Sequence, residues 1–331
     1  MALVSSMHAR IVLMALLSAA IGLHTLSTAR AQSYPDRLIR VIVPQAAGGP
    51  TDLLARATAQ RLQSALGQNV VTENRGGAGG VIAAKQVASA DPDAYTLLLG
   101  NTSVLVHIPI LSRSAGYDPA KVFAPVARLA TSYQIIFVHP SLPVKSMQEF
   151  VAYAKAHPGK LNYSSAGVGN TLHLAGELLK YKAGIDITHV PYNSGAEAMT
   201  AVLSGQVQMS MVSLSGLLPL LQEGKLRAIA ATSPTRFPEL PEVPTMIESG
   251  FPDFTVPAFF GMVAPKATPQ AIVEKLNATI NQELGSPEMQ KTIANMGAAR
   301  GTGSAKDFAD FITAERRKWE AVVEATGIRI D

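Results

Sequence analysis

The chain has 331 residues, no cysteine and a formal net charge of +4 from 28 basic and 24 acidic side chains. This length suits two α/β lobes, each with its own core, and exceeds that of a small disulfide-stabilised scaffold. The lack of cysteine excludes thiol catalysis and cysteinyl metal sites, and a charge so near neutral indicates no nucleic-acid partner.

Residues 1–31 have the three parts of a secretory signal peptide. Arg10 precedes the apolar runs Ile11–Leu17 and Ala19–Leu23, and Ala29-Arg30-Ala31 fits an A-x-A cleavage site. The apolar run is too short and too poorly flanked to favour the alternative, an N-terminal anchor helix. The pattern predicts cleavage after Ala31 and export to the periplasm. The mature charge would be +2, because Arg10 and Arg30 are removed with no acid.

Short β-rich runs alternate with helical patterns along the rest of the chain. A helix is expected over about 51–66, where Ala55, Ala59, Leu62 and Leu66 share one face. Such alternation favours parallel sheets covered by helices. The strands are expected at Leu38–Val43, Gln68–Glu73, Thr96–Gly100, Gln134–His139, Lys160–Ser164, Thr188–Pro191, Met209–Val212 and Leu226–Thr232.

Three helix starts carry capping signals. Thr268-Pro269 and Ser286-Pro287 each place a hydroxyl before a proline suited to the first helical position, and Ser304 with Asp307 resembles a capping box. The proline-rich stretch 234–257 predicts a long surface connection with a short helix near 245–249. The last helix carries an apolar stripe that we assign to core packing.

Glycine-rich turns directly follow three of the predicted strands. They are Pro44–Asp52, Asn74–Gly80 and Ser164–Thr171, and each opens a helix. A helix N-terminus offers unpaired N–H groups and partial positive charge to an anion, and glycine lets a ligand approach the backbone closely. Each turn alone also has a purely steric explanation, but the three together favour a site for a carboxylate or a phosphate.

Other chemistries find no support in the motifs. Gly167-x-Gly169 lacks the third glycine of a dinucleotide fingerprint, because position 172 is Leu. No Gly-x-Ser-x-Gly elbow, Ser-x-x-Lys or His-Glu-x-x-His sequence occurs, and the histidines share no ligand spacing. His173 is read as a hydrogen-bonded helix residue. We therefore expect no cofactor, no metal and no enzymatic activity.

Taken as an ordered set, several segments resemble the Bug (TctC) family of extracytoplasmic solute receptors of tripartite tricarboxylate transporters. The resemblance covers essentially the whole mature chain. Two short segments, Arg75-Gly76-Gly77 and Asp93-Ala94-Tyr95, depart from the family pattern. We interpret both as sequence changes at the surface that leave the pocket unaltered. The matching runs are Tyr34-Pro35, Pro44–Arg56, Glu73–Gly80, Ala90–Leu98, Tyr163–Leu178, Val190–Tyr192, Gly224–Ala228 and Leu240–Thr245.

The resemblance implies a two-lobed α/β periplasmic-binding-protein (flytrap) fold. Each lobe would be a mostly parallel sheet flanked by helices, and β crossovers would join the lobes. We expect residues 32–130 and 256–331 in lobe 1 and residues 131–255 in lobe 2. The protein would be a monomer that captures a small organic carboxylate in the interlobe cleft for a membrane permease. A receptor for a sensor kinase and a periplasmic α/β enzyme stay as alternatives.

The resemblance also implies site residues. One carboxylate of the ligand would be bound directly by Gly167, Gly169, Asn170 and Thr171. A second polar end of the ligand would be contacted through water by Ala47, Gly48 and Gly49. Further ligand-binding candidates are Ser103, Tyr192 and Ser213. Many relatives carry an aspartate near the end of the strand that here reads Met209-Ser210-Met211-Val212, so we expect a di- or aromatic carboxylate without an amine. Asp52 is expected to favour the dipole of its own helix.

Overall fold

Ten strands hydrogen-bond into one continuous sheet in the computed structural model, which describes residues 34–330. Residues 37–330 belong to one unit, which is described here by itself. Its strands follow the order β2-β1-β3-β9-β4-β7-β5-β6, and β8 and β10 also pair with β4. The predicted signal peptide, residues 1–31, lies outside the described residues.

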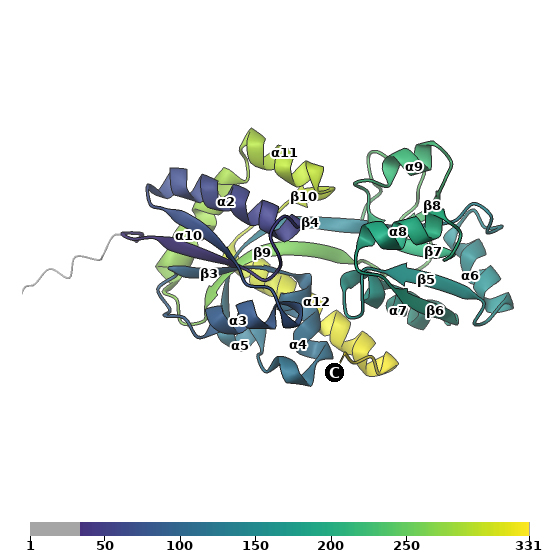
Figure 1. The fold of residues 1–331 in the computed structure, drawn as a ribbon, viewed down its shortest axis with the longest axis horizontal. Helices are drawn as coiled ribbons and strands as arrows, with labels where there is room; N and C mark the ends of the chain where they lie inside the picture. Colours follow the sequence, from purple (N-terminus) through teal and green to yellow (C-terminus); the bar gives the residue numbers. More distant parts are fainter. Residues whose placement is uncertain (1–33, 331) are drawn as a thin grey trace, which may run out of the picture. The chain divides into compact units, whose positions relative to one another are not determined.

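The first lobe is built on three parallel strands, β1 (Ile39–Val43), β2 (Val70–Asn74) and β3 (Thr96–Asn101). Four of the five β1 residues are buried, as expected of a strand covered on both faces. Figure 1 shows α2 (Pro50–Leu66) on one side of these strands and α3 (Val81–Ala88) on the other. Each helix follows a strand directly, so its N-terminus lies at the carboxyl edge of the sheet.

The second lobe repeats this arrangement with β5 (Leu161–Ser165), β6 (Ile187–Pro191) and β7 (Met209–Ser213), again parallel. Figure 1 shows α8 (Gly195–Leu203) and α7 (Thr171–Ala183) on opposite sides of β5. The remaining elements of this part of the chain are α6 (Met147–Ala156), α9 (Leu218–Gln222) and β8 (Arg227–Ala231).

Two long strands connect the lobes. β4 (Phe123–Val138) pairs with β9 (Pro257–Pro265) through residues 123–133 and with β7 through residues 134–138. Every antiparallel pairing of the sheet involves β4 or β9, while the nucleus of each lobe is parallel. The two-lobed α/β fold and its β crossovers are thereby confirmed. The exact lobe boundaries given above stay a prediction.

The chain ends on helices that return to the first lobe. Asn277 of α10 donates to the Val126 carbonyl of β4 at 2.8 Å, and α12 packs along β4. These elements are α10 (Gln270–Glu283), α11 (Pro287–Asn295), β10 (Ala298–Arg300) and α12 (Ala305–Thr326). Between β3 and β4 lie the π-helical segment η2 (Ser103–His107), α4 (Ile108–Leu111) and α5 (Pro119–Val122).

Two of the three capping signals are confirmed. The Ser286 hydroxyl accepts from the Met289 N–H, and Ser304 and Asp307 form a reciprocal capping box. Thr268 does not cap, because Pro269 is the extended residue before α10 and the helix begins at Gln270. The expected short helix near 245–249 is wrong, since this segment is a hydrogen-bonded turn.

The strand predictions were incomplete for β4, β9 and β10. Gln134–His139 is only the end of the 16-residue β4, and neither β9 nor β10 was expected as a strand. Within residues 34–330 no helix combines the length and the apolar character that a membrane crossing requires.

Candidate ligand-binding cleft

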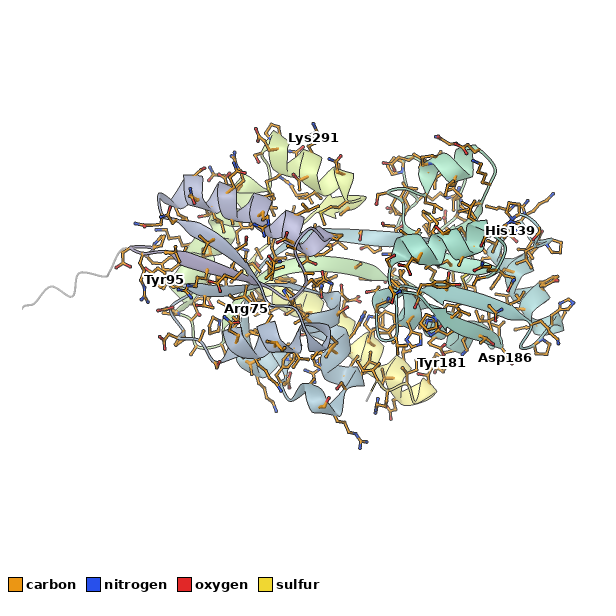
Figure 2. The ribbon with its side chains drawn as sticks, in the orientation of Figure 1. Arg75, Tyr95, His139, Tyr181, Asp186 and Lys291 are labelled. Atoms are coloured by element: carbon orange, nitrogen blue, oxygen red, sulfur yellow. The ribbon has the colours of Figure 1, made fainter. Side chains whose placement is uncertain are left out.

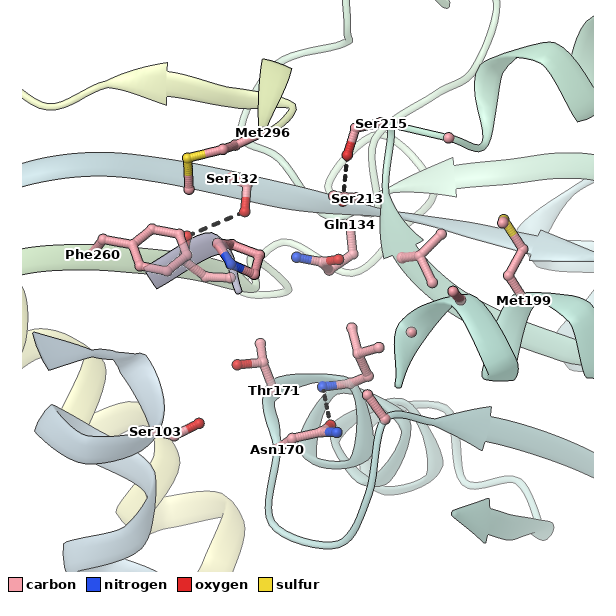
Figure 3. A pocket seen from close by; sticks show the side chains of 18 of the residues that line it. Ser103, Ser132, Gln134, Asn170, Thr171, Met199, Ser213, Ser215, Phe260 and Met296 are labelled. Carbon is pink, nitrogen blue, oxygen red and sulfur yellow. Dashed lines mark hydrogen bonds between the residues drawn. The ribbon is translucent and has the colours of Figure 1, made fainter. Parts of the chain in front are cut away.

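A cavity of about 600 Å³ lies between the two lobes, at the carboxyl edges of their parallel strands. Apolar side chains from both lobes make up most of its lining, and a smaller set of polar neutral side chains lies among them (Figure 3). Such a concave site with a few convergent polar groups is the usual form of a small-molecule pocket. Its labelled lining residues are Ser103, Ser132, Gln134, Asn170, Thr171, Met199, Ser213, Ser215, Phe260 and Met296.

Two further hollows adjoin this cavity and extend it. One, of about 1050 Å³, shares Pro50, Ser103 and Asn170 with it and runs past the glycine turn 76–80 to Ile330. The other, of about 200 Å³, shares Pro50, Ser103 and Thr171. The three hollows therefore form one cleft centred on Pro50 and Ser103 of the first lobe and residues 170–171 of the second.

The described lining of the cleft is uncharged. Among the residues that the structure describes, no Asp, Glu, His, Lys or Arg lines any of the three hollows. A charged ligand must therefore be held by hydroxyls, amides and backbone N–H groups. Apolar contact for the body of a ligand is offered by Leu53, Met199, Val212, Phe260 and Met296.

The N-terminus of α7 supplies hydrogen-bond donors to the cleft. Asn170 is its N-cap, and its side-chain oxygen accepts from the N–H groups of Leu172 at 2.8 Å and His173 at 2.9 Å. This cap leaves the Thr171 N–H, at the positive end of the helix, available to a ligand. The Asn170 amide nitrogen is itself buried and has no partner among the described residues. An acceptor atom of a ligand would satisfy both groups.

The N-terminus of α2 already has a carboxylate beside it, that of Asp52 in the first turn of the helix. The Asp52 carboxylate, 2% exposed, accepts from the Gly48 N–H at 2.9 Å, from Asn74 at 2.9 Å and from Arg56 at 2.9 Å. Burial alone would raise the pKa of Asp52, but these hydrogen bonds together hold it below its ordinary value. Because Pro50 at the first helical position has no N–H, the N-terminus of α2 offers an anion fewer hydrogen-bond donors than the N-terminus of α7 does.

Ser103 enters the cleft from an unusual backbone segment. It opens η2, a single π-helical turn of the kind that is rare and often found at functional sites. The residue borders all three hollows. The same turn buries His107 completely against Trp319, with ring centroids 5.2 Å apart. Ser103 therefore rests on a packed, rigid support.

The structure brings most of the predicted site residues to the cleft. Ser103, Asn170, Thr171 and Ser213 line the central cavity. Ala47, Gly49 and Gly169 line the adjoining hollow. Gly48, Gly167 and Tyr192 line none of the three, and they support the loops from behind. Gly48 donates to Asp52, and the Tyr192 N–H donates to the Ser165 carbonyl at 2.9 Å.

Sequence reasoning missed several cleft residues. Ser132 and Gln134 lie on β4, and Ala258 and Phe260 lie on β9, paired with it (Figure 3). Met199 comes from α8, and Asn295 and Met296 come from the end of α11. No motif marks these positions. Only the predicted β crossovers at the lobe boundaries, near residues 130 and 256, pointed to this region.

A serine–histidine pair lies beside the cleft but outside it. Ser165 Oγ is 2.7 Å from His189 Nε2, a distance also found between a nucleophile and its base. Ser165 is fully buried and lines none of the described hollows. Its hydroxyl is engaged with both the N–H and the carbonyl of Gly167 at 3.1 Å. A substrate in the cleft could not reach it.

The sequence matches the family model described as "Tripartite tricarboxylate transporter family receptor" over residues 54–328. It is 35% identical over 301 residues to Protein BugT of Bordetella pertussis, an alignment covering 91% of this chain and 92% of BugT. A protein encoded in the gbd 5' region of Cupriavidus necator is 35% identical over 312 residues, with 94% of each chain covered.

Solved structures agree with these sequence matches. A protein of R. palustris with adipate has a TM-score of 0.75 and 37% identity, covering 89% of this chain and 99% of the other. MatC from Rhodopseudomonas palustris, with bound malate, has a TM-score of 0.73 and 34% identity, covering 88% and 100%. A TctC solute-binding protein from Polaromonas reaches a TM-score of 0.79 at 27% identity, covering 88% and 99%.

Proposed function

This chain belongs to the family of tripartite tricarboxylate transporter receptors, and on that premise we propose that it captures a small organic carboxylate in its interlobe cleft for such a transporter. The observation that carries the proposal is the α7 N-terminus, where Asn170 and Thr171 line the cleft and the buried Asn170 amide nitrogen has no partner among the described residues. Relatives of the same fold hold adipate and malate.

The carboxylate would be bound directly at α7. Thr171 would donate its N–H and its hydroxyl, Asn170 would bind through its amide, and Gly169 would let the ligand approach the backbone. Gly167 would shape the turn through its bonds to Ser165. Ser103 and Ser213 would contact the ligand from opposite lobes. Ala47 and Gly49, which line the adjoining hollow, would hold a second polar end through water, and Gly48 and Tyr192 would support the loops.

The lining of the cleft indicates which carboxylates it selects. An enclosed ammonium group needs an acceptor, preferably a carboxylate, and none of the described lining residues supplies one. Phe260, Met296 and Val212 offer apolar contact instead. We propose that di- and aromatic carboxylates without an amine bind more tightly than amino acids.

Titration calorimetry on the mature protein tests this function. Succinate, adipate, citrate and terephthalate-like acids are titrated alongside aspartate and glutamate, after a thermal-shift screen. A ligand at about 100 times its Kd adds about 2.7 kcal/mol of stability. Failure of every acid to bind would contradict the carboxylate function, and tighter binding of aspartate or glutamate would contradict the selection against amines.

We also propose where the protein is located and which partner receives its ligand. Cleavage after Ala31 would release a periplasmic monomer beginning at Gln32, which would hand its ligand to a membrane permease. Mass spectrometry of the periplasmic protein identifies its first residue, and retention of Arg10 would contradict cleavage after Ala31. Transport of the ligand by cells that lack only this protein would favour the alternative role of a receptor for a sensor kinase.

An enzymatic role has less support. The Ser165–His189 pair is the arrangement nearest to a nucleophile and a base around the cleft, and Ser165 is buried away from it. We propose that the protein binds its ligand without changing it. Recovery of chemically unaltered ligand after long incubation, by mass spectrometry, is the expected result.

A further inference from the structure

Two stacked histidines lie directly behind the loop that is proposed to bind the carboxylate. The rings of His173 on α7 and His189 on β6 are 4.0 Å apart with an angle of 24° between their planes. Tyr163 of β5 stacks on the other side of His189 at 4.9 Å. His173 is 8% exposed, and neither histidine lines the cleft.

Each histidine is hydrogen-bonded to the loop itself. The Gly169 N–H donates to His173 Nδ1 at 3.1 Å, and Ser165 Oγ lies 2.7 Å from His189 Nε2. Ser165 in turn bonds both polar backbone groups of Gly167. The two rings thereby fix both ends of the turn 165–169, immediately before the Asn170 cap of α7.

The bond from Gly169 requires a particular protonation state. His173 Nδ1 can accept it only while that nitrogen carries no proton, since an imidazolium has two N–H donors and no acceptor. A protonated His173 would set two donors against each other and would place positive charge beside the His189 ring. The loop geometry observed here is therefore the geometry of a neutral His173.

We infer that His173 and His189 are positioning residues for the turn 165–169, and that His173 holds this turn in its ligand-binding geometry only while it is neutral, so that acidification releases the carboxylate. This inference rests on the proposed binding at α7. It assigns a role in the site to side chains that do not touch the ligand.

The surroundings of the pair favour its neutral state near pH 7. Burial lowers the pKa of His189 to about 4, with a further contribution from His173. Burial also lowers the pKa of His173, against an opposing effect of Glu177. The ionisable groups around the pair are Tyr163, whose hydroxyl donates to Glu177 at 2.7 Å, Glu177 itself, and Lys180, which is 3.0 Å from Glu177. Release is expected below pH 6.5 and not above it.

Substituting His173 separates this positioning role from simple support. His173→Phe keeps a stacking ring and removes the acceptor for Gly169, so carboxylate affinity at pH 7.5 should fall about fivefold, the worth of one hydrogen bond. His173→Gln restores an acceptor that does not titrate, so it should bind like the wild type at pH 7.5. It should also retain affinity on acidification except for the loss due to the ligand's own protonation. His139→Phe, on the second lobe at a site distant from the cleft (Figure 2), should behave like the wild type.

The backbone amide of Gly169 gives a readout that needs no ligand. In a pH titration followed by NMR, its resonance should shift below pH 6.5 in the wild type and stay unchanged in His173→Gln. An unchanged Gly169 resonance in the wild type, or the same pH profile of affinity in wild type and His173→Gln, would overturn the inference. If the wild type binds no carboxylate, the proposed function fails separately, and the Gly169 titration still decides the role of the histidines.

Discussion

Single residues of the α7 loop differ in how much binding depends on them. Gly169 has a φ of +79°, and a Cβ added there would lie 3.1 Å from Ile330 Cγ2. Thr171 contributes a hydroxyl in addition to its backbone N–H. A side chain at 169 thus disturbs the backbone that shapes the site, whereas the loss of the Thr171 hydroxyl removes one donor and leaves the backbone in place.

We expect Thr171→Ala to weaken carboxylate binding by about 1 kcal/mol, the worth of one hydrogen bond, and Gly169→Val to abolish it. Calorimetry on both variants measures this, with Thr188→Ala on an exposed position of β6 as the control. Wild-type affinity in both variants would place the site elsewhere.

Val212 is the residue through which the charge of the cleft can be changed most directly. It lines the central cavity and is 8% exposed. Val212→Asp should weaken dicarboxylate binding roughly tenfold or more, because like charges a few Å apart repel by at least about 1.4 kcal/mol in such a site. Val212→Asn introduces polarity without charge and should lose much less. Equal calorimetric affinities of Val212→Asp and the wild type would show that Val212 does not face the ligand.

At the scale of elements, α7 lies unusually close to β5. Gly176, in the middle of the helix, faces the buried ring of Tyr163, and a Cβ added there would lie 2.1 Å from Tyr163 Cε2. The ring cannot yield easily, because its hydroxyl donates to Glu177 and it stacks on His189. This close approach explains a glycine in a helix interior, where it costs roughly 1 kcal/mol relative to alanine.

Gly176→Ala should therefore destabilise the protein by about 1–3 kcal/mol, since overpacking outweighs the gain in helix propensity. Gly195→Ala, at the first residue of α8, is the matched control, because its Cβ would meet Val212 at an ordinary 3.8 Å. Urea denaturation compares the two variants. A Gly176→Ala protein as stable as the control would refute the packing argument.

The strands differ in how well the sequence predicts them. Strands β1, β3 and β5 to β8 were predictable because short apolar runs end in glycine or polar turns. β9 was missed because Pro257 and Pro265 bound it, and the first half of β4 because Pro125 interrupts it, yet both strands pair over this length. Register shifts in that pairing accommodate the interruption, and they depend on partners more than 100 residues apart.

The candidate site was predictable only where a local signal exists. The turn before α7 could be found from its glycines and the Asn170 cap, because both act on their own neighbourhood. Phe260 and Met296 could not, since the long-range pairing of β9 and the end of α11 bring them to the cleft. The histidine pair behind the loop was equally invisible, because His189 reaches His173 through the β5–β6 pairing.

Across the whole molecule, acid should lower stability through buried neutral histidines. His107 is fully buried, neither ring nitrogen has a partner among the described residues, and burial, with the charge of Lys318, lowers its pKa to about 3. The unfolded chain takes up a proton near pH 6.5. The stabilisation by neutral His107 is thus complete above pH 6.5 and is lost as the pH falls towards 3, with a slope of up to about 1.4 kcal/mol per pH unit.

His107→Leu should remove the part of this pH dependence that His107 contributes and cost little stability at pH 7.5, since it deletes two buried nitrogens that make no hydrogen bond to a described residue. Urea denaturation at pH 7.5, 6 and 5 makes the comparison. An unchanged difference between pH 7.5 and pH 5 in the variant would contradict this account of His107.

Ligand binding should also bring the lobes together. The cleft is lined from both sides, so one ligand that contacts Ser103 and Thr171 is enclosed only if the lobes approach. The radius of gyration from small-angle scattering should fall on saturation with a tight ligand. Gly169→Val, which should not bind, is the control. A scattering curve of the wild type that does not change on saturation would argue against closure.

The late return of the chain to its first sheet has a consequence for the order of folding. β3 pairs with β9 at Asn101 and Phe260, and β4 pairs with β10 at Ala130 and Arg300. β3 and β4 thus lack these partners until the last third of the chain exists, whereas β5, β6 and β7 follow one another within 53 residues, from Leu161 to Ser213. Non-local pairing of this kind forms slowly. We therefore expect the sheet of the first lobe to be completed late, and an incomplete chain to leave the β9 edge of β3 and of β4 unpaired while it emerges.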